Sequence, residues 1–148
     1  MKKFFLVIVC SIFTFILAGC TSNKNINLDN VYENLTDDYT DFIKVDEDVL
    51  TGNYGIDVSV FKDYLVVMNE AGTTSKMYAI FEAGDSYEDA EDEATYFVNK
   101  YTESWDNGYF PDETKLVNDG ITEKYGNYII YVVNDDADNI ITKIKSSN

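Results

Sequence analysis

The sequence predicts an α+β protein in which one antiparallel sheet, made of two hairpins, is covered by helices. Short apolar runs come in two pairs, over residues 64–81 and 121–133, and each pair is joined by turn-forming residues. Stretches with apolar residues at three- or four-residue steps precede, separate and follow these pairs. The predicted order is therefore α-ββ-α-ββ-α, because two hairpins with apolar faces most simply join into one sheet.

The chain begins with the pattern of an export signal. Two lysines precede an apolar run over residues 4–17, and the small residues Ala18 and Gly19 follow it. The run is shorter than the roughly 18 apolar residues that cross a bilayer. We therefore expect residues 1–19 to be a signal peptide that is removed during export.

Residues 17–20 read LAGC and resemble the bacterial lipoprotein box, in which the cysteine sulfur receives a diacylglyceryl group. The resemblance implies lipidation of Cys20, cleavage directly before it, and anchoring to the outer face of the bacterial cytoplasmic membrane. The alternatives are a secretory signal with a chance cysteine, or a disulfide, which would lack a partner because Cys10 leaves with the signal. Residues 20–27 are then the lipidated cysteine and a polar tether.

Residues 28–148 are long enough for one domain with a single core, and their charge limits what that domain binds. The chain has 27 acidic residues against 11 lysines, and neither arginine nor histidine. This balance argues against nucleic acid, whose phosphates need cationic side chains. It also argues against adsorption to anionic headgroups, so the lipid itself must hold the protein. The acidic excess is typical of solubility, and a preference for cationic partners or divalent ions is the alternative.

The domain is predicted to begin with a helix capped by Asn27, a residue type that favours the N-cap position. Apolar residues recur at helical steps from Leu28 to Phe42, and acidic residues lie near the predicted start, where the helix dipole favours them. Residues 44–57 contain two glycines and several acidic residues. They are predicted to form a loop with one helical turn.

The middle of the chain is predicted to be a hairpin followed by a long helix. Residues 64–68 and 77–81 are apolar runs on either side of a turn-rich segment. Asp85 and Glu88 then match an acidic capping box. One apolar face follows at helical spacing and ends at Trp105, which we expect to be substantially buried.

Gly108 and Pro111 are predicted to end this helix and to open a loop. Tyr109 and Phe110 lie in that loop, outside the predicted core faces. Aromatic residues in this sequence are mostly explained by core packing. These two are the candidate contact residues for a peptide or a glycan, because binding residues concentrate on loops.

The last part of the domain is predicted to be a second hairpin and a final helix. Residues 121–125 and 128–133 flank Gly126-Asn127, a pair that suits a type II′ turn. Asp135 or Asp136 is expected to cap a helix. Its apolar side is formed by three isoleucines, Ile140, Ile141 and Ile144.

Several short motifs between residues 54 and 138 resemble a known bacterial family. They are Tyr54-Gly55-Ile56-Asp57, Tyr109-Phe110-Pro111-Asp112-Glu113, and the run from Asn118-Asp119-Gly120 through Gly126-Asn127-Tyr128 to Asp135-Asp136-Ala137-Asp138. Their order and spacing resemble a lipoprotein domain family described as domain of unknown function 4358, over most of residues 50–145. The resemblance implies an exported, lipid-anchored domain. It implies no activity, and it assigns a role to no residue.

The residue types in this sequence do not fit the common catalytic and metal-binding motifs. Zinc and iron sites need histidine, a thiolate or a carboxylate cluster with a supporting shell. Histidine is absent, and Cys20 is expected to be acylated, so these metals are not expected. Calcium loops beginning at Asp89 or Asn134 place a lysine where the last carboxylate belongs, so we expect no metal site. The pair Ser75-Lys76 lacks the spacing of Ser-Lys enzymes. Phosphate-binding glycine motifs are also missing, and we expect no cofactor.

The sequence therefore predicts a lipid-anchored, extracytoplasmic, non-catalytic module that binds a partner or serves a structural role. The expected partners are the membrane, through the lipid on Cys20, and an envelope protein or glycan. The alternative is an acidic-residue hydrolase that acts on polymers of the cell envelope. Two carboxyl groups in a groove, one with a raised pKa, would favour that alternative.

Overall fold

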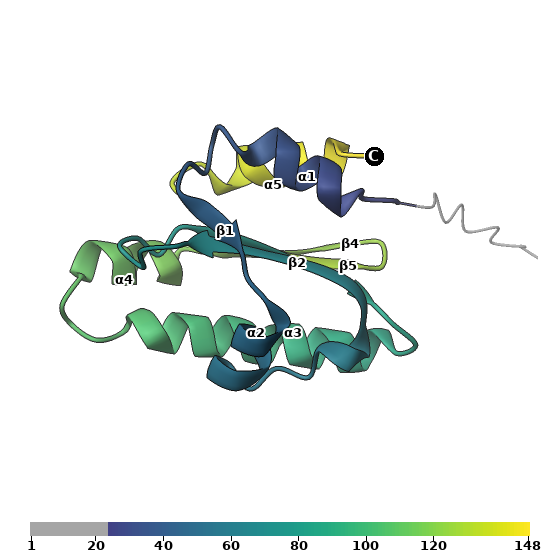
Figure 1. The fold of residues 1–148 in the computed structure, drawn as a ribbon, viewed down its shortest axis with the longest axis horizontal. Coiled ribbons are helices and arrows are strands. Elements are labelled where there is room, and N and C mark those ends of the chain that lie inside the picture. The colour runs from purple at the N-terminus through teal and green to yellow at the C-terminus, as the bar shows by residue number, and fades with distance from the viewer. Residues whose placement is uncertain (1–23) are drawn as a thin grey trace, which may run out of the picture.

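The computed structural model describes residues 24–148, which form an antiparallel five-stranded sheet with helices on both faces (Figure 1). The strand order is β1-β2-β3-β5-β4. The strands are β1 (Phe42–Lys44), β2 (Phe61–Asn69), β3 (Met77–Ala83), β4 (Ile121–Tyr125) and β5 (Tyr128–Val133). The predicted α+β class is confirmed, although the chain has more elements than the predicted order contains.

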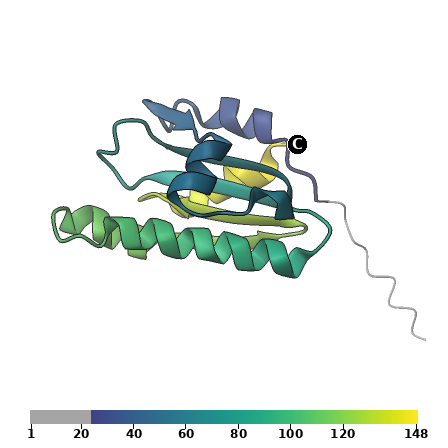
Figure 2. The same ribbon diagram turned by 60° about the horizontal axis from the view of Figure 1, so that its bottom comes forward.

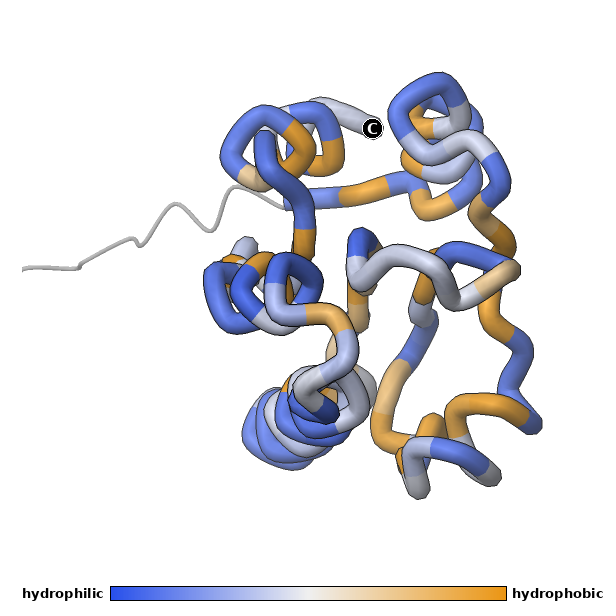
Figure 3. The backbone as a smooth tube through the Cα atoms, turned by 90° about the vertical axis from the view of Figure 1, so that its left-hand side faces the viewer, coloured by the Kyte–Doolittle hydropathy of each residue, from blue (hydrophilic) through white to orange (hydrophobic). Residues whose placement is uncertain are grey.

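The helices divide between the two faces of the sheet. Helices α1 (Leu28–Leu35) and α5 (Ala137–Ser146) pack on one face. Helices α2 (Glu47–Asn53), α3 (Tyr87–Trp105) and α4 (Pro111–Asn118) pack on the other, together with a short 3-10 turn, Val58–Val60. In Figure 3 hydrophilic residues colour the outward sides of the helices, which is the pattern of amphipathic helices around a central sheet.

Alternate residues of the central strands supply the two cores, because successive side chains of a strand point to opposite faces. All six residues of β5 are buried, since helices cover both of its sides. The α3 face receives Val66, Met77, Ala79, Phe81, Ile129, Tyr131 and Val133. The α1 and α5 face receives Leu65, Val67, Tyr78, Ile80, Tyr128, Ile130 and Val132.

Both predicted hairpins are confirmed. Strands β2 and β3 pair with Leu65 opposite Ile80. Strands β4 and β5 pair up to Tyr125 opposite Tyr128, and Gly126 in the turn has φ +61°, the left-handed conformation that favours glycine. The hairpins join through β3 and β5, which makes one continuous sheet.

The first predicted helix is wrong in its length. Helix α1 has the expected N-cap, since the Asn27 side chain accepts a hydrogen bond from the Asn30 N–H at 3.0 Å, but it ends at Leu35. The chain then turns through Asp41, which has φ +65°, and Phe42 pairs with Asn69 as part of β1. Residues 42–44 therefore form a strand against the free edge of β2, although the apolar spacing of this segment predicted a helix.

Two helices lie where loops were predicted. Helix α2 has two turns instead of one, and it buries Leu50 completely. Helix α4 begins at Pro111, which was expected only to end the preceding helix. Proline also favours the first position of a helix, because its ring has a helical φ and its missing N–H needs no partner there. The expected capping box of α3 is wrong as well, because Ser86 accepts the Asp89 N–H.

The packed chain begins before the predicted boundary at residue 28. Ile26 is buried, and its N–H donates to the Tyr128 hydroxyl at 3.2 Å. The Asn27 N–H donates to the Ser147 carbonyl oxygen at 2.8 Å. The last residues of the predicted tether therefore pack against the domain. The signal peptide and Cys20 lie outside the described residues.

The chain enters the domain at the end of the sheet opposite to the α3–α4 connection (Figures 1 and 2). Lys24 lies beside the β4–β5 turn, where its aliphatic carbons approach Gly126 and its ammonium group lies 4.5 Å from the centre of the Tyr125 ring. Among residues 24–148, no helix combines the length and the apolar character needed to cross a membrane.

Candidate functional site

A cleft of about 300 Å³ opens where α3 passes into α4, at the end of the molecule opposite to the chain entry. Its walls come from the end of α2, the connection between β2 and β3, the last turns of α3 and the start of α4. The lining residues are Tyr54, Met68, Asn69, Gly72, Thr74, Tyr101, Ser104, Trp105, Asn107 and Phe110.

Aromatic rings lead from the core of the protein to this cleft. Phe97, Tyr101 and Trp105 follow one another at four-residue steps on α3, so they lie on one side of the helix. The Tyr101 and Trp105 ring centres are 6.5 Å apart, and Trp105 lies 6.4 Å from Phe110, both pairs in edge-to-face geometry. Exposure rises along the series, from 0% at Phe97 to 52% at Phe110.

The Tyr101 hydroxyl fixes the inner wall of the cleft. It donates a hydrogen bond of 2.8 Å to the Ser75 carbonyl oxygen, although the two residues come from α3 and from the segment before β3. Burial raises the pKa of Tyr101 above its ordinary value, so the hydroxyl stays protonated and keeps donating at any physiological pH. This bond ties the end of α3 to the sheet.

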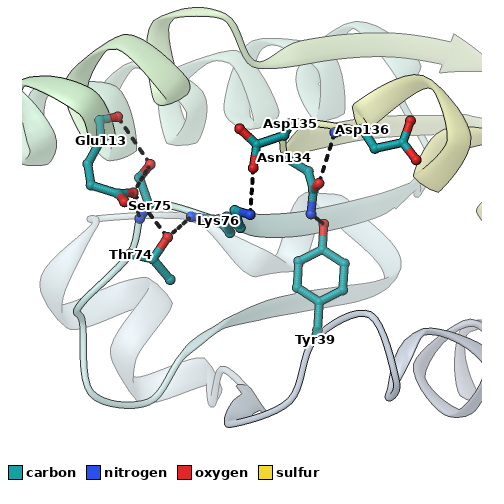
Figure 4. A network of polar contacts seen from close by, with 8 residues as sticks. All are labelled: Tyr39, Thr74, Ser75, Lys76, Glu113, Asn134, Asp135 and Asp136. Atoms are coloured by element: carbon teal, nitrogen blue, oxygen red, sulfur yellow. Dashed lines mark hydrogen bonds and ion pairs between the residues drawn. The ribbon is translucent and has the colours of Figure 1, made fainter.

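Glu113 on α4 holds the neighbouring wall (Figure 4). Its Oε2 accepts hydrogen bonds from the Ser75 N–H at 2.5 Å, the Ser75 hydroxyl at 2.8 Å and the Thr74 hydroxyl at 3.0 Å. Burial by itself would raise the pKa of Glu113. The hydrogen bonds from Ser75 and Thr74, with the nearby charge of Lys76, outweigh burial and lower the pKa. Glu113 therefore works as an anchor between α4 and the β2–β3 connection.

A second polar chain runs beside this anchor (Figure 4). The Lys76 ammonium group forms an ion pair of 2.6 Å with Asp135. The Asn134 amide then accepts from the Asp136 N–H at 3.0 Å and donates to the Tyr39 hydroxyl at 3.1 Å. Ser75 and Lys76 thus point to different partners, and their geometry is that of a structural network instead of a Ser-Lys catalytic pair.

The cleft differs from the rest of the surface in its charge. None of the described residues that line it is acidic or basic, although 26% of the chain is charged. Ile43 extends this uncharged region. It pairs with Met68 across β1 and β2, which places its side chain on the same face of the sheet, and it is 44% exposed.

A separate groove of about 440 Å³ between α4 and the start of α5 has the opposite character. Four aspartates line it, and two of them are engaged in ion pairs, Asp119 with Lys115 and Asp135 with Lys76. A hydrogen bond and charge from Lys76 lower the pKa of Asp135, whereas a general acid needs a raised one. Within residues 24–148, no group of three acidic or thiol side chains is arranged to hold a metal ion.

The two candidate contact residues, Tyr109 and Phe110, take different positions relative to the cleft. Phe110 lines the cleft, whereas Tyr109 is 82% exposed beside it, with its N–H bound to the Asn107 side chain at 2.9 Å. Trp105, which was expected to be substantially buried, is partly buried, packs against the core under α3 and lines the cleft as well. Sequence reasoning did not predict the contribution of Tyr54. The sequence signal that marks the site is the group of aromatic residues from Tyr101 to Phe110.

Comparison with known proteins identifies the family of the chain. The chain has no match among curated proteins and none among solved structures. The model of the family described as Domain of unknown function (DUF4358) matches residues 25–134, which include every residue that lines the cleft. This confirms the resemblance seen in the sequence motifs. The chain therefore belongs to the DUF4358 family.

Proposed function

We infer that this protein is a non-catalytic binding module, exported and held at the outer face of the cytoplasmic membrane by a lipid on Cys20. Its cleft binds a partner in the cell envelope. The observation that carries this proposal is the uncharged cleft with partly exposed aromatic rings, in a chain that is otherwise strongly acidic. Exposed aromatic surface costs free energy in water, and its concentration at one place is typical of an interaction site.

The direction of the chain supports the same proposal. Cys20 lies four residues before Lys24, and four extended residues span at most about 14 Å. A lipid on Cys20 would keep the entry end of the domain near the membrane. The cleft at the opposite end would then face outward, toward the polymers and proteins of the envelope.

The engaged polar groups support a module without catalysis. The Ser75 hydroxyl is tied to Glu113, and the Lys76 ammonium group to Asp135. The surroundings lower the pKa of Asp57, Glu113 and Asp135. Lowered values keep these carboxylates ionised at neutral pH, which is unsuited to a general acid.

The anchor is tested by replacing Cys20 in the native host. Wild-type protein should have the intact mass of a chain that begins at an acylated Cys20. Cys20→Ser should remain uncut, or be cut elsewhere, and should carry no lipid. A wild-type chain that begins at any other residue, or that lacks the acyl mass, would contradict the anchoring.

The binding role is tested with the full chain, purified in detergent and mixed with lipid-extracted envelopes from the host. Wild-type protein should sediment with the envelopes, and Phe110→Ala should lose most of this retention. Tyr96→Ala is the matched control, since Tyr96 is 43% exposed on α3 and does not line the cleft. Equal retention of both variants would contradict a role of the cleft. Soluble fragments released by wild-type protein would favour the hydrolase alternative.

A further inference from the structure

We propose that the cleft binds an uncharged sugar chain. This rests on the proposed binding function and adds the chemical class of the ligand. The juxtaposition that points to it is a set of aromatic rings beside amide and hydroxyl groups, with no charged residue among the described residues that line the cleft.

The absence of charge along the described lining argues against ionic ligands. A phosphate or carboxylate ligand needs lysine or arginine beside it, and a cationic peptide needs a free carboxylate. The lining offers neither. The Glu113 carboxylate contacts the lining residue Thr74, and its Oε2 already accepts hydrogen bonds from Thr74 and Ser75. In an acidic chain, an uncharged cleft fits a ligand without charge.

The aromatic rings match one side of a sugar. Each pyranose ring has a flat face of C–H groups, which packs against an aromatic ring and removes apolar area from water. Trp105 and Phe110 are both partly exposed at the cleft, and their rings meet at 64°, so they present two differently inclined surfaces. Two such surfaces suit a chain of linked rings better than a single flat ring.

The polar groups match the hydroxyls at the edges of a sugar ring. The Asn107 amide donates to the Ser104 carbonyl oxygen only at the long distance of 3.5 Å, which leaves its second N–H for a ligand. The Tyr54 hydroxyl contacts the Met68 sulfur at 3.7 Å, and a thioether is a weak acceptor. Both groups therefore retain hydrogen-bonding capacity at the cleft.

The size and shape suit a short length of a longer chain. The volume of about 300 Å³ lies at the lower end of the roughly 300–1,000 Å³ range of small-molecule sites. The cleft is open to solvent, and its lining residues Asn107 and Phe110 are exposed, as expected where a polymer enters and leaves. Its outward direction in the anchored protein would make such a polymer accessible.

The experiment uses the full chain in detergent and the fluorescence of Trp105, the only tryptophan in the sequence. The probes are cellotetraose, chitotetraose and maltotetraose as uncharged chains, tetragalacturonate as an anionic chain, and tetralysine as a cationic peptide. At least one uncharged tetrasaccharide should shift the emission with a saturable titration. The charged probes should not, and about 0.5 M salt should leave the sugar affinity unchanged, because screening acts only on charges.

Two variants and one control test the contacts. Phe110→Ala should weaken sugar binding about fivefold or more, the loss expected for one aromatic contact. Tyr54→Phe, which removes only the hydroxyl, should weaken binding about threefold or more, as expected for one neutral hydrogen bond. Tyr96→Ala should bind like wild type. Thermal melts of all variants show whether each is folded before it is compared.

The possible outcomes separate this inference from the proposed function. No saturable shift with any uncharged tetrasaccharide would overturn the sugar inference. Binding of tetralysine that disappears in salt would overturn it as well and indicate a cationic peptide. If envelope retention still depends on Phe110 in those cases, the binding module stands and only the ligand class is wrong. Retention that is independent of Phe110 would overturn the proposed function itself.

Discussion

The two faces of the sheet differ in how their aromatic residues are arranged. On the face covered by α1 and α5, Tyr39 and Tyr78 are both nearly fully buried, with ring centres 5.0 Å apart. The Tyr39 hydroxyl is paired with Asn134. On the face covered by α3, the aromatic series continues past the core and emerges at the surface as Trp105 and Phe110.

Contacts between the two ends of the chain tie α1 to the end of α5 on the first face. The Asn27 N–H donates to the Ser147 carbonyl oxygen, and the Asn30 and Asn34 side chains reach Asn148 and Ser147. On the other face, the cleft at the end of α3 has the exposed Phe110 in its lining. Tyr39 and Tyr78 are therefore enclosed by packing, whereas Phe110 at the cleft is about half exposed to solvent.

The largest effect expected from this comparison is at Phe97, in the core under α3. Phe97 is 0% exposed and packs against the rings of Tyr54, Phe81 and Tyr101. Phe97→Ala should lower the free energy of unfolding by about 3–5 kcal/mol, because it leaves a cavity. Denaturant unfolding measures this. The exposed neighbour gives the control, since Tyr96→Ala should change stability by about 0.5 kcal/mol or less.

A smaller loss is expected at Trp105, where the core meets the cleft. Trp105→Ala removes a partly buried ring and its contacts with Tyr101 and Phe110, so unfolding should become easier by about 2 kcal/mol. The same denaturant titration measures it. A loss as large as that of Phe97→Ala would show that Trp105 belongs to the core and would weaken the contrast between the two faces.

The hydrogen bonds that Glu113 on α4 accepts from Ser75 and Thr74 should make the stability of the protein sensitive to acid. Because the pKa of Glu113 is lowered below its ordinary value of 4.5, its contribution to stability is complete above about pH 4.5. It is lost as the pH falls through the lower value of the folded protein. Glu113→Gln should lower the free energy of unfolding by about 1–2 kcal/mol at pH 7, since hydrogen bonds to an ionised group are lost.

Melting curves of wild type and Glu113→Gln between pH 7 and acid conditions measure this dependence. The difference between the two proteins should shrink as the pH falls below about 4.5, since the wild-type carboxylate is then progressively protonated. A difference that stays constant with pH would show that the Glu113 charge has no part in holding α4.

The smallest effect on stability is expected at the exposed rim of the cleft. Tyr109 and Phe110 are 82% and 52% exposed, and their joint replacement by alanine should cost about 1 kcal/mol or less. Thermal melts should therefore show that the double variant is folded. The envelope assay should show that it is no longer retained. A loss of stability equal to that of Trp105→Ala would instead place both rings in the core.

Most regular elements could be predicted from local sequence patterns. The two hairpins follow from paired apolar runs, and the β4–β5 turn follows from Gly126-Asn127. The buried sides of α3 and α5 follow from apolar residues at helical spacing. These features depend on residues close in sequence, where the period of the side chains and the chemistry of the turn decide the structure.

The cleft and the remaining elements were decided by the tertiary structure. Segment 42–44 becomes a strand because the edge of β2 offers it hydrogen bonds, in spite of a helical apolar period. Helix α4 is held against the β2–β3 connection because Glu113, two residues after Pro111, accepts hydrogen bonds from Ser75 across the fold. The sequence by itself determined which aromatic residues the chain has near residues 101–110. Pairing of β3 with β5, and packing of α2 and α3 on that sheet, decided that Tyr54 meets them, because contacts across such sequence distances depend on the whole sheet.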